Sequence, residues 1–312
     1  MSVNYAENLS HYPNKGKCGQ AEIFDSTEVL QSKIKQLAEM IKASKYIVVH
    51  TGAGISTSAG IPDFRGPRGV WTLEEKGKKP EINITFETAQ PTLTHMAVVE
   101  LARAGIVKYV ISQNVDGLHW KSGLPRNKVS ELHGNMFVDR CDRCYQEYCH
   151  AHASVTVGCK KTGTRCTRND RCRGYIRDTI LDWEDSLPEK DLLSAEDHLR
   201  RSDLSLCLGT SLQIKPSGDL PLLTLKNNGC IAICNLQPTK LDKKASLCIH
   251  GYVDQVMIGV MDELGLPIPK YSPMITENLL KRKFDCIKEE RLVDGEPDNK
   301  KALTNHKRPS GC

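Results

Sequence analysis

Four short apolar runs along the chain each end in a polar or glycine-rich motif. The runs are Tyr46–Val49, Ile106–Ile111, Leu204–Leu208 and Cys230–Cys234. Mostly apolar stretches of this length are typical of strands buried on both faces of a parallel sheet. The motifs that follow them are His50–Ser56, Ser112–Gly117, Gly209–Ser211 and Asn235–Gln237. Since ligands of open α/β sheets bind beyond the carboxyl ends of the strands, the four motifs together predict one nucleotide site.

Helical patterns separate these runs. Apolar residues recur at helical spacing from Leu30 to Ile41, and Asp25 with Glu28 has the form of a capping box before them. A second helix is predicted at 92–104. Residues 66–91 are polar and broken by glycine and proline, which is typical of a mobile loop, here placed over the site. The alternation of strands and helices predicts an α/β fold, a Rossmann-like doubly wound parallel sheet.

Composition changes along the chain suggest its organisation. Residues 1–24 predict an irregular N-terminal arm, and residues 25–137 with 176–268 predict a Rossmann-like nucleotide-binding domain split in two. Residues 138–175 interrupt the α/β pattern with six cysteines, which predicts a smaller inserted module. In the tail, 269–312, the stretch 281–301 holds 13 Asp, Glu, Lys or Arg among 21 residues. This predicts a short helix at 277–287 and disorder beyond it.

Bulk properties exclude several classes of protein. With 39% hydrophobic and 26% charged residues among 312, the chain has the composition of a soluble globular protein. No apolar stretch approaches the ~20 residues that span a bilayer, and the first residues lack the apolar core of a signal peptide. We therefore expect an intracellular protein without a membrane partner. Thirteen cysteines in such a setting favour reduced thiols, some of them bound to metal.

The inserted module carries a candidate zinc site. Cys141 and Cys144 have the spacing of a zinc knuckle, and Cys166 and Cys172 follow after 21 residues with a wider spacing. Four thiolates would complete a tetrahedral shell, so this zinc would be structural rather than catalytic. Alternative ligands lie between the two pairs: Cys149, Cys159, His150 and His152.

The first motif also carries candidate phosphate-binding residues. Gly52 and Gly54 would let the backbone approach a phosphate at the start of a following helix. The third glycine of the dinucleotide fingerprint is missing, because Thr57 stands in its place. Gly60–Gly66 then sets a carboxylate, an aromatic ring and a guanidinium in successive positions, and a guanidinium can pair with phosphate oxygens in bidentate geometry.

Several of these blocks together resemble the signature of the sirtuins, NAD-consuming protein lysine deacylases. They are GAGIS at 52–56, GIPDFRG at 60–66, QNVD at 113–116, LHG at 132–134 and GTS at 209–211. The resemblance covers roughly residues 45–260. DTILDWEDSLP at 178–188 and GPRGVW at 66–71 resemble the class IV branch of the family.

The resemblance implies roles for individual residues. His133 would be the general base, since an imidazole titrates near neutral pH and can take a proton from a ribose hydroxyl. Asn114 and Asp116 would complete the catalytic set around the nicotinamide and its ribose. Val253 would face the adenine, and Trp71 would stand where class IV members carry a short ordered segment in place of a long cofactor loop. The full cofactor-binding set is Gly52, Ala53, Gly54, Ser56, Thr57, Ile61, Asp63, Phe64, Arg65, Trp71, Gln113, His133, Gly209, Thr210, Ser211, Asn235, Leu236, Gln237 and Val253.

The resemblance also implies cofactors, activity and partners. It implies NAD as a co-substrate and one structural zinc on Cys141, Cys144, Cys166 and Cys172, because CRG at 172–174 matches the last ligand block of the family. Deacetylation and long-chain deacylation of histones and other chromatin proteins would follow, with protein mono-ADP-ribosyltransferase activity, in chromatin regulation and DNA repair in the nucleus. Weak basic clusters at 281–283 and 306–309 are the candidate import signals.

Charge suggests a further partner and leaves an alternative function open. Residues 140–173 hold eight Lys or Arg and three Asp or Glu, a surplus of +5 that equals the net charge of the whole chain. Such a patch attracts phosphate backbones, so contact with nucleosomal DNA is one interpretation and a solvated face is the other. The alternative function is a zinc-stabilised chromatin or DNA-binding protein that senses NAD without efficient turnover. A hydride-transferring dehydrogenase is a third interpretation.

Overall fold

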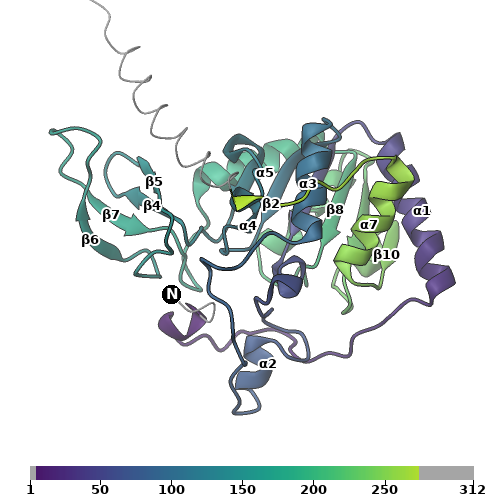
Figure 1. Cartoon of the computed structure of the whole chain (residues 1–312), viewed down its shortest axis with the longest axis horizontal. Coiled ribbons are helices and arrows are strands. Elements are labelled where there is room, and N and C mark those ends of the chain that lie inside the picture. The colour runs from purple at the N-terminus through teal and green to yellow at the C-terminus, as the bar shows by residue number, and fades with distance from the viewer. Residues whose placement is uncertain (1–4, 274–312) are drawn as a thin grey trace, which may run out of the picture.

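The computed structural model describes residues 5–273, which form two sheets of different kinds (Figure 1). The larger sheet is parallel, with strand order β10-β9-β8-β1-β2-β3. Chain order runs from β1 outward through β2 to β3, and then resumes with β8 on the other side of β1. The prediction of a doubly wound, Rossmann-like parallel sheet is confirmed. The bounds are β1 Ile47–Thr51, β2 Val107–Ser112, β3 Val129–Glu131, β8 Leu204–Leu208, β9 Cys230–Cys234 and β10 Leu247–Ile249.

Two of the four predicted strands begin and end where the apolar runs do, namely β8 and β9. The strand β1 runs two residues further than its apolar run, through His50 and Thr51, which the sequence placed in the following motif. Both side chains are buried because these residues pair with β2 on one side and with β8 on the other. The hydrophobic pattern therefore could not locate the end of β1, because the polar residues His50 and Thr51 continue the strand inside the sheet.

Helices cover both faces of this sheet. Residues of α1, α3 and α7 form the main hydrophobic core with one face, and α5 packs against the other face (Figure 1). The α1 helix is capped by Ser26, whose hydroxyl accepts from the Val29 amide, so the predicted Asp25 cap is wrong. Asp25 instead pairs with Lys33 at 2.6 Å.

The α-helices are α1 Thr27–Ala43, α2 Val70–Glu74, α3 Leu93–Arg103, α4 Leu118–Lys121, α5 Glu189–Arg201, α6 Leu222–Leu225 and α7 Val253–Leu264. The 3₁₀ turns are η1 Tyr5–Asn8, η2 Ala53–Ile55, η3 Thr57–Ala59, η4 Arg126–Lys128, η5 Ser217–Asp219 and η6 Asp242–Lys244.

The inserted module is an antiparallel sheet with strand order β5-β4-β7-β6. Its strands are β4 Val138–Cys141, β5 Glu147–Cys149, β6 Lys161–Arg165 and β7 Tyr175–Asp178. Because β7 pairs with β4 and β6, this sheet runs through Asp178, beyond the residue where the sequence pattern placed the end of the insertion. One of the two partners of β7, the strand β4, lies far from β7 in sequence, so local periodicity gives no sign of that pairing.

The N-terminal arm lies against the loops at the carboxyl ends of the parallel strands. The Gly19 amide donates to the carbonyl of Arg65 at 2.9 Å, and the Ile23 amide donates to the carbonyl of Leu236 at 2.8 Å. Figure 1 shows this purple segment running beneath both sheets from η1 past α2 to α1. The arm therefore forms part of the wall at this edge of the molecule.

The segment 66–91 differs from the polar loop that the sequence predicted. It contains α2, and its Trp71 and Phe86 are almost fully buried, at 2% and 1% exposed. These two aromatic side chains, which stand far apart among polar and charged residues, anchor the segment. Within residues 5–273, no helix is both long and apolar enough to cross a bilayer. The predicted helix at 277–287 and the charged tail lie outside the described residues.

Candidate active site

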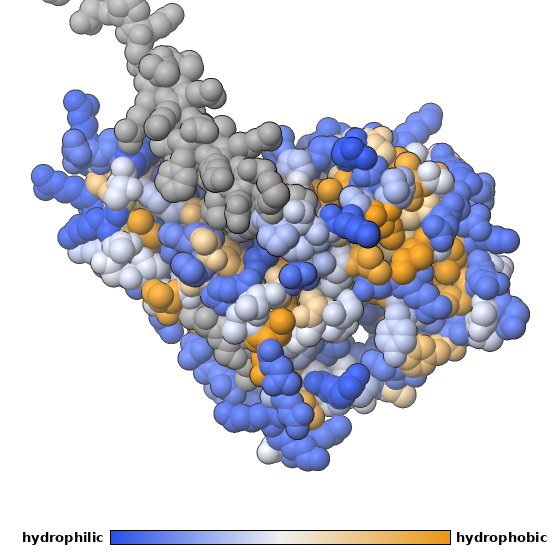
Figure 2. Space-filling model, viewed as in Figure 1, coloured by the Kyte–Doolittle hydropathy of each residue, from blue (hydrophilic) through white to orange (hydrophobic). Residues whose placement is uncertain are grey.

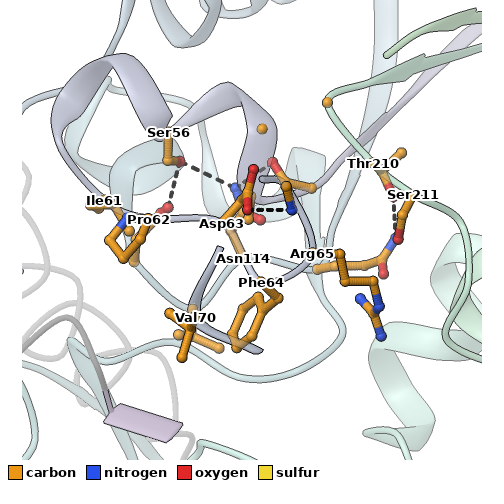
Figure 3. A pocket seen from close by; sticks show the side chains of 18 of the residues that line it. Ser56, Ile61, Pro62, Asp63, Phe64, Arg65, Val70, Asn114, Thr210 and Ser211 are labelled. Atoms are coloured by element: carbon orange, nitrogen blue, oxygen red, sulfur yellow. Dashed lines mark hydrogen bonds between the residues drawn. The ribbon is translucent and has the colours of Figure 1, made fainter. Parts of the chain in front are cut away.

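The four motifs converge on one cavity of about 130 Å³ at the carboxyl ends of β1, β2, β8 and β9. Figure 3 shows Ser56 and Asp63 on one side of it, and Thr210 with Arg65 on the other. The predicted residues that line the cavity are Gly52, Ala53, Gly54, Ser56, Ile61, Asp63, Phe64, Arg65, Trp71, Gln113, Asn114, Asp116, His133, Gly209, Thr210, Ser211, Asn235 and Gln237. The arrangement matches the binding edge of an open α/β sheet.

Three predicted cofactor residues do not line the cavity. The Thr57 side chain is exposed, and its hydroxyl donates to the carbonyl of Gly54 at 3.1 Å. Val253 begins α7 and packs into the main hydrophobic core, because its position on the helix faces α1 and α3. Leu236 uses its carbonyl to bind the N-terminal arm. These three side chains lie outside the cavity lining, and their direct contact with the cofactor stays a prediction.

Gly52 and Gly54 let two strand ends touch. The Gly54 amide donates to the carbonyl of Gly209 at 2.9 Å. A Cβ added at Gly52 would lie 2.7 Å from that carbonyl oxygen, and one added at Gly54 would lie 2.8 Å from the Gly209 Cα. The glycines are followed by the short turns η2 and η3 and not by an α-helix, so the expected helix N-terminus behind a phosphate is absent here. Both positions need glycine because the loops after β1 and β8 pack too closely to leave room for a Cβ.

Ser56 holds a carboxylate and an amide in fixed positions. Its hydroxyl donates to Asp116 Oδ2 at 2.6 Å and accepts from Asn114 Nδ2 at 3.3 Å. The Asn114 amide also donates to the carbonyl of Gly52 at 3.0 Å, and the Leu118 amide donates to the second Asp116 oxygen at 2.9 Å. Asp116 is 4% exposed, and this burial raises the pKa of its carboxyl. A rigid, weakly hydrated acidic group therefore faces the cavity.

His133 presents a basic nitrogen to the same cavity. Its Nδ1 lies 3.0 Å from the carbonyl oxygen of Gln113. A carbonyl only accepts, so Nδ1 carries the hydrogen and Nε2 keeps its lone pair. Burial lowers the pKa of the imidazole to about 4, and the nearby charge of Arg65 acts in the same direction. The ring is neutral at physiological pH and can accept a proton at Nε2.

Aromatic rings from distant segments close the cavity around Arg65. The guanidinium lies 4.5 Å from the centre of the Trp71 ring, and Arg65 Nε donates to the carbonyl of Lys15 at 2.7 Å. The Trp71 ring in turn contacts Phe64 at 4.9 Å and Trp183 at 5.1 Å between centroids. Aromatic side chains packed at such tilted and edge-on angles exclude water, and they strengthen electrostatic interactions inside the site.

Sequence reasoning assigned no role in the site to several lining residues. They are Tyr5, Ala6, Pro62, Gly66, Val70, Phe86, Val115, Trp183 and Ile214. Trp183 lies in the DWEDS stretch already singled out, so its position in that block was an available signal. Tyr5 sits in the irregular arm, where no periodicity or motif marked it.

The predicted zinc ligands lie together in the inserted module. All four sulfur atoms of Cys141, Cys144, Cys166 and Cys172 are within 4.8 Å of one another. The Cys141–Cys172 pair is 3.7 Å apart and the Cys144–Cys166 pair 3.5 Å apart. Tetrahedral zinc with Zn–S bonds of ~2.3 Å requires sulfur pairs about 3.8 Å apart, so this set can hold a structural zinc.

Two further observations favour this ligand set. A Cβ at Gly174 would overlap the Cys141 sulfur, so the backbone is shaped around the cluster. Cys159 points elsewhere, because its thiol donates to the carbonyl of Ile180 at 3.6 Å. Cys149 packs beside the cavity-lining hydrophobic residues. Neither of these cysteines belongs to the cluster.

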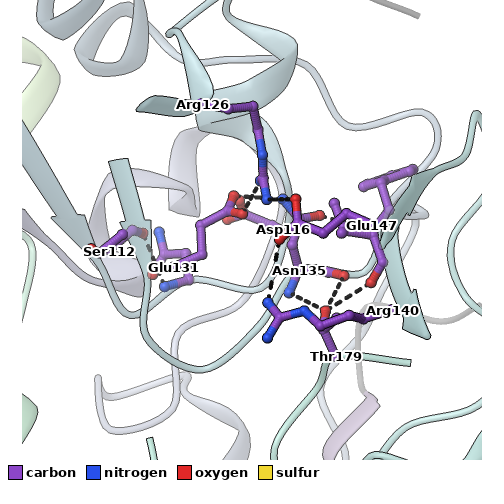
Figure 4. A network of polar contacts seen from close by, with 12 residues as sticks. Ser112, Asp116, Arg126, Glu131, Asn135, Arg140, Glu147 and Thr179 are labelled. Carbon is purple, nitrogen blue, oxygen red and sulfur yellow. Dashed lines mark hydrogen bonds and ion pairs between the residues drawn. The ribbon is translucent and has the colours of Figure 1, made fainter. Parts of the chain in front are cut away.

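A polar network joins the two sheets beside the His133 loop (Figure 4). Arg126, just before β3, pairs with Glu131 and lies 3.0 Å from Glu147 on β5. Glu131 also accepts from the Asn135 amide at 2.5 Å, on the other side of His133. These partly buried contacts fix the loop that carries His133 and connect it to the inserted module.

A Rossmann-like sheet with a glycine-rich edge, a neutral histidine and a four-cysteine module defines a nucleotide-dependent enzyme with a structural metal site. Residues 79–216 match the model of the Sir2 family. The chain is 55% identical over 278 residues to the NAD-dependent protein deacetylase Sirt6 of Drosophila melanogaster, covering 87% of this chain and 88% of that protein. The chain belongs to the Sir2 family, as the resemblance implied.

Two other comparisons agree. The chain is 40% identical to the NAD-dependent protein deacetylase sirtuin-7 of Homo sapiens over 281 residues, which are 81% of this chain and 65% of that protein. A solved structure of Sir2 with a p53 peptide and NAD⁺ superimposes with a TM-score of 0.59 at 32% identity, over 75% of this chain and 99% of that one. Likeness to Sirt6 and sirtuin-7 is consistent with the class IV branch.

Proposed function

We propose that this protein is an NAD-dependent protein-lysine deacylase that consumes NAD as a co-substrate. The observation that carries the proposal is His133, whose unprotonated Nε2 faces a cavity that also holds the fixed Asp116 carboxylate and Asn114 amide. When bound, NAD supplies a ribose carbon that the acyl oxygen of a modified lysine can attack as nicotinamide leaves. His133 would take the ribose hydroxyl proton at Nε2, and Asp116 with Asn114 would hold the nicotinamide and its ribose.

The lining of the cavity supports an acyl-lysine as the second substrate. Ile61, Phe86 and Val115 line the cavity and pack in one hydrophobic cluster, so they form an apolar wall next to the polar strand ends. Apolar groups gain free energy by leaving water for such a wall, so acetyl and longer acyl chains both fit the chemistry of this side. Deacetylation and long-chain deacylation are both part of the proposal.

Product analysis tests the function. The protein is incubated with NAD and histone peptides that carry acetyl or long-chain acyl lysines, and the products are identified by mass spectrometry. Nicotinamide, O-acyl-ADP-ribose and deacylated peptide in equal amounts support the proposal. Mono-ADP-ribosylated protein would add the transferase activity. Reduced NAD would instead identify a dehydrogenase, and NAD binding without any product would favour a chromatin-bound NAD sensor.

We further propose that the protein acts on histones and other chromatin proteins in the nucleus, in chromatin regulation and DNA repair. The inserted module presents exposed basic residues on β6 and on the loop that follows it: Arg165, Arg168, Arg171 and Arg173. Hydrophilic side chains project from the outer edge of this sheet (Figure 2). Contact with nucleosomal DNA there would bring histone-tail lysines near the cavity.

Replacing Arg165, Arg168, Arg171 and Arg173 by glutamine should weaken nucleosome binding and its dependence on salt. Each lost phosphate contact removes about 0.9 from the slope of log K against log salt concentration. Binding is measured at several salt concentrations, and activity on a free acyl peptide should stay unchanged. The control replaces four exposed lysines of the larger lobe by glutamine: Lys35, Lys45, Lys226 and Lys243. Equal slopes for the two variants would show that the module's charge is a solvated face.

A further inference from the structure

Lys121 is a buried lysine that the chemistry described above does not use. It is the last residue of α4, and 5% of its surface is exposed. Burial of an ammonium group is costly unless its donors are satisfied. Nζ donates to the carbonyls of Phe86 at 2.6 Å, Glu87 at 3.0 Å and Ala89 at 3.2 Å. Three carbonyls match the three donors of an ammonium group, so the lysine is a cation tethered inside the turn 85–89.

That turn carries one wall of the cavity. The Ala89 amide donates to the carbonyl of Thr85 at 3.0 Å, which closes the turn, while three other carbonyls of the turn accept from Nζ. Phe86 lines the cavity and is 1% exposed. Glu87 accepts from the amide of Ala153 in the inserted module at 3.0 Å. A movement of the turn would therefore displace both the cavity wall and a contact with the inserted module.

The other end of α4 is connected to the carboxylate of the site. Asp116 accepts from the Leu118 amide at the start of the helix, and the Lys121 amide donates to the carbonyl of Gly117 at 2.9 Å. The Nζ atom also lies 4.5 Å from the centre of the Phe137 ring, which fixes the side chain from a second direction. The single turn of α4 therefore connects Asp116 at one end with the Lys121 ammonium group at the other, and this group holds the Phe86 carbonyl.

We propose that Lys121 is a positioning residue for the acyl-lysine substrate, and that it acts by clamping the 85–89 turn so that Phe86 stays in the cavity wall. The inference rests on the proposed deacylase function. Lys121 does not itself line the cavity, so its effect passes through Phe86. An ammonium or guanidinium group supplies enough donors to hold this turn, whereas an apolar side chain of the same length supplies none.

Kinetics of Lys121→Met and Lys121→Arg test the proposal. Lys121→Met should raise KM for the acyl peptide about tenfold or more and change KM for NAD less than about twofold, because the turn that Lys121 holds carries Phe86 and none of the predicted cofactor-binding residues. Lys121→Arg should restore most of the loss. The matched control is Lys128→Met. Lys128 Nζ also donates to a backbone carbonyl, that of Ala102 at 3.0 Å, but this contact lies away from the cavity. Equal increases in both KM values, or an equal effect of Lys128→Met, would overturn the proposal.

Hydrogen exchange gives a measure that is independent of activity. Amides of 85–89 should exchange faster in Lys121→Met than in wild type, and Lys121→Arg should return them to the wild-type rate. Unchanged exchange overturns the clamp. Faster exchange with an unchanged KM for acyl peptide overturns the role in substrate positioning. If the wild type turns over no acyl peptide, the proposed function fails while exchange still decides the clamp. If Lys121→Met does not fold, Lys121→Gln, with two donors for three carbonyls, takes its place in both measurements.

Discussion

His133→Tyr should lower acyl-lysine-dependent NAD turnover by at least ~100-fold, the range expected when a general base is lost. The imidazole is neutral here because burial lowers its pKa to about 4, and its Nε2 can take a proton. A tyrosine hydroxyl stays protonated at neutral pH, since its ordinary pKa is near ~10, and it cannot serve as that base. Turnover is measured as nicotinamide release that depends on the acyl peptide.

The variant should remain folded, which its thermal melting curve checks. His152→Tyr is the matched control, because His152 is exposed on the inserted module and should keep full activity. Near-normal turnover by His133→Tyr, with an unchanged melting curve, would remove His133 from the mechanism.

One zinc per chain should be lost when any of Cys141, Cys144, Cys166 or Cys172 is replaced by serine. Structural zinc sites of this kind bind with apparent free energies of about 10–16 kcal/mol in isolated peptides, and that binding is coupled to folding. We therefore expect the inserted sheet to lose its structure without zinc, while the parallel sheet keeps its own core. Metal analysis of the purified variants, with hydrogen exchange of β4 and β7, measures both effects.

Cys149→Ser and Cys159→Ser are the controls for the zinc prediction. Both cysteines lie in the same module, but neither belongs to the sulfur cluster, so both variants should keep one zinc. The ligand set would be wrong if either control lost the metal while Cys166→Ser or Cys172→Ser kept it.

The parallel sheet could be predicted because its signals are local. The strands at 204–208 and 230–234 are mostly apolar runs that end at polar or glycine-rich motifs, and both burial and pairing follow from that pattern. The convergence of Gly52, Asn114 and Gly209 followed from strand ends meeting at one edge of a parallel sheet. Residues in these positions could be assigned to one cavity from the chain alone.

Contacts between distant segments could not be predicted in the same way. Tyr5 reaches the cavity through an arm that is tied down by single hydrogen bonds to loops far along the chain, such as Ile23 to Leu236. The choice between Asp25 and Ser26 as helix cap depended on Lys33 and His250, which draw Asp25 away. Such competition among tertiary partners leaves no mark on local spacing.

The partner of His133 has a consequence for how the site ionises. In a Ser-His-Asp triad a carboxylate orients the imidazole, and the charges of the two groups depend on each other. Here a peptide carbonyl takes that place, and it has no proton to gain or lose. The choice of basic nitrogen is therefore insensitive to the ionisation of any neighbour and to the side chain at position 113. A shift of the main chain just after β2 would remove the contact that selects it.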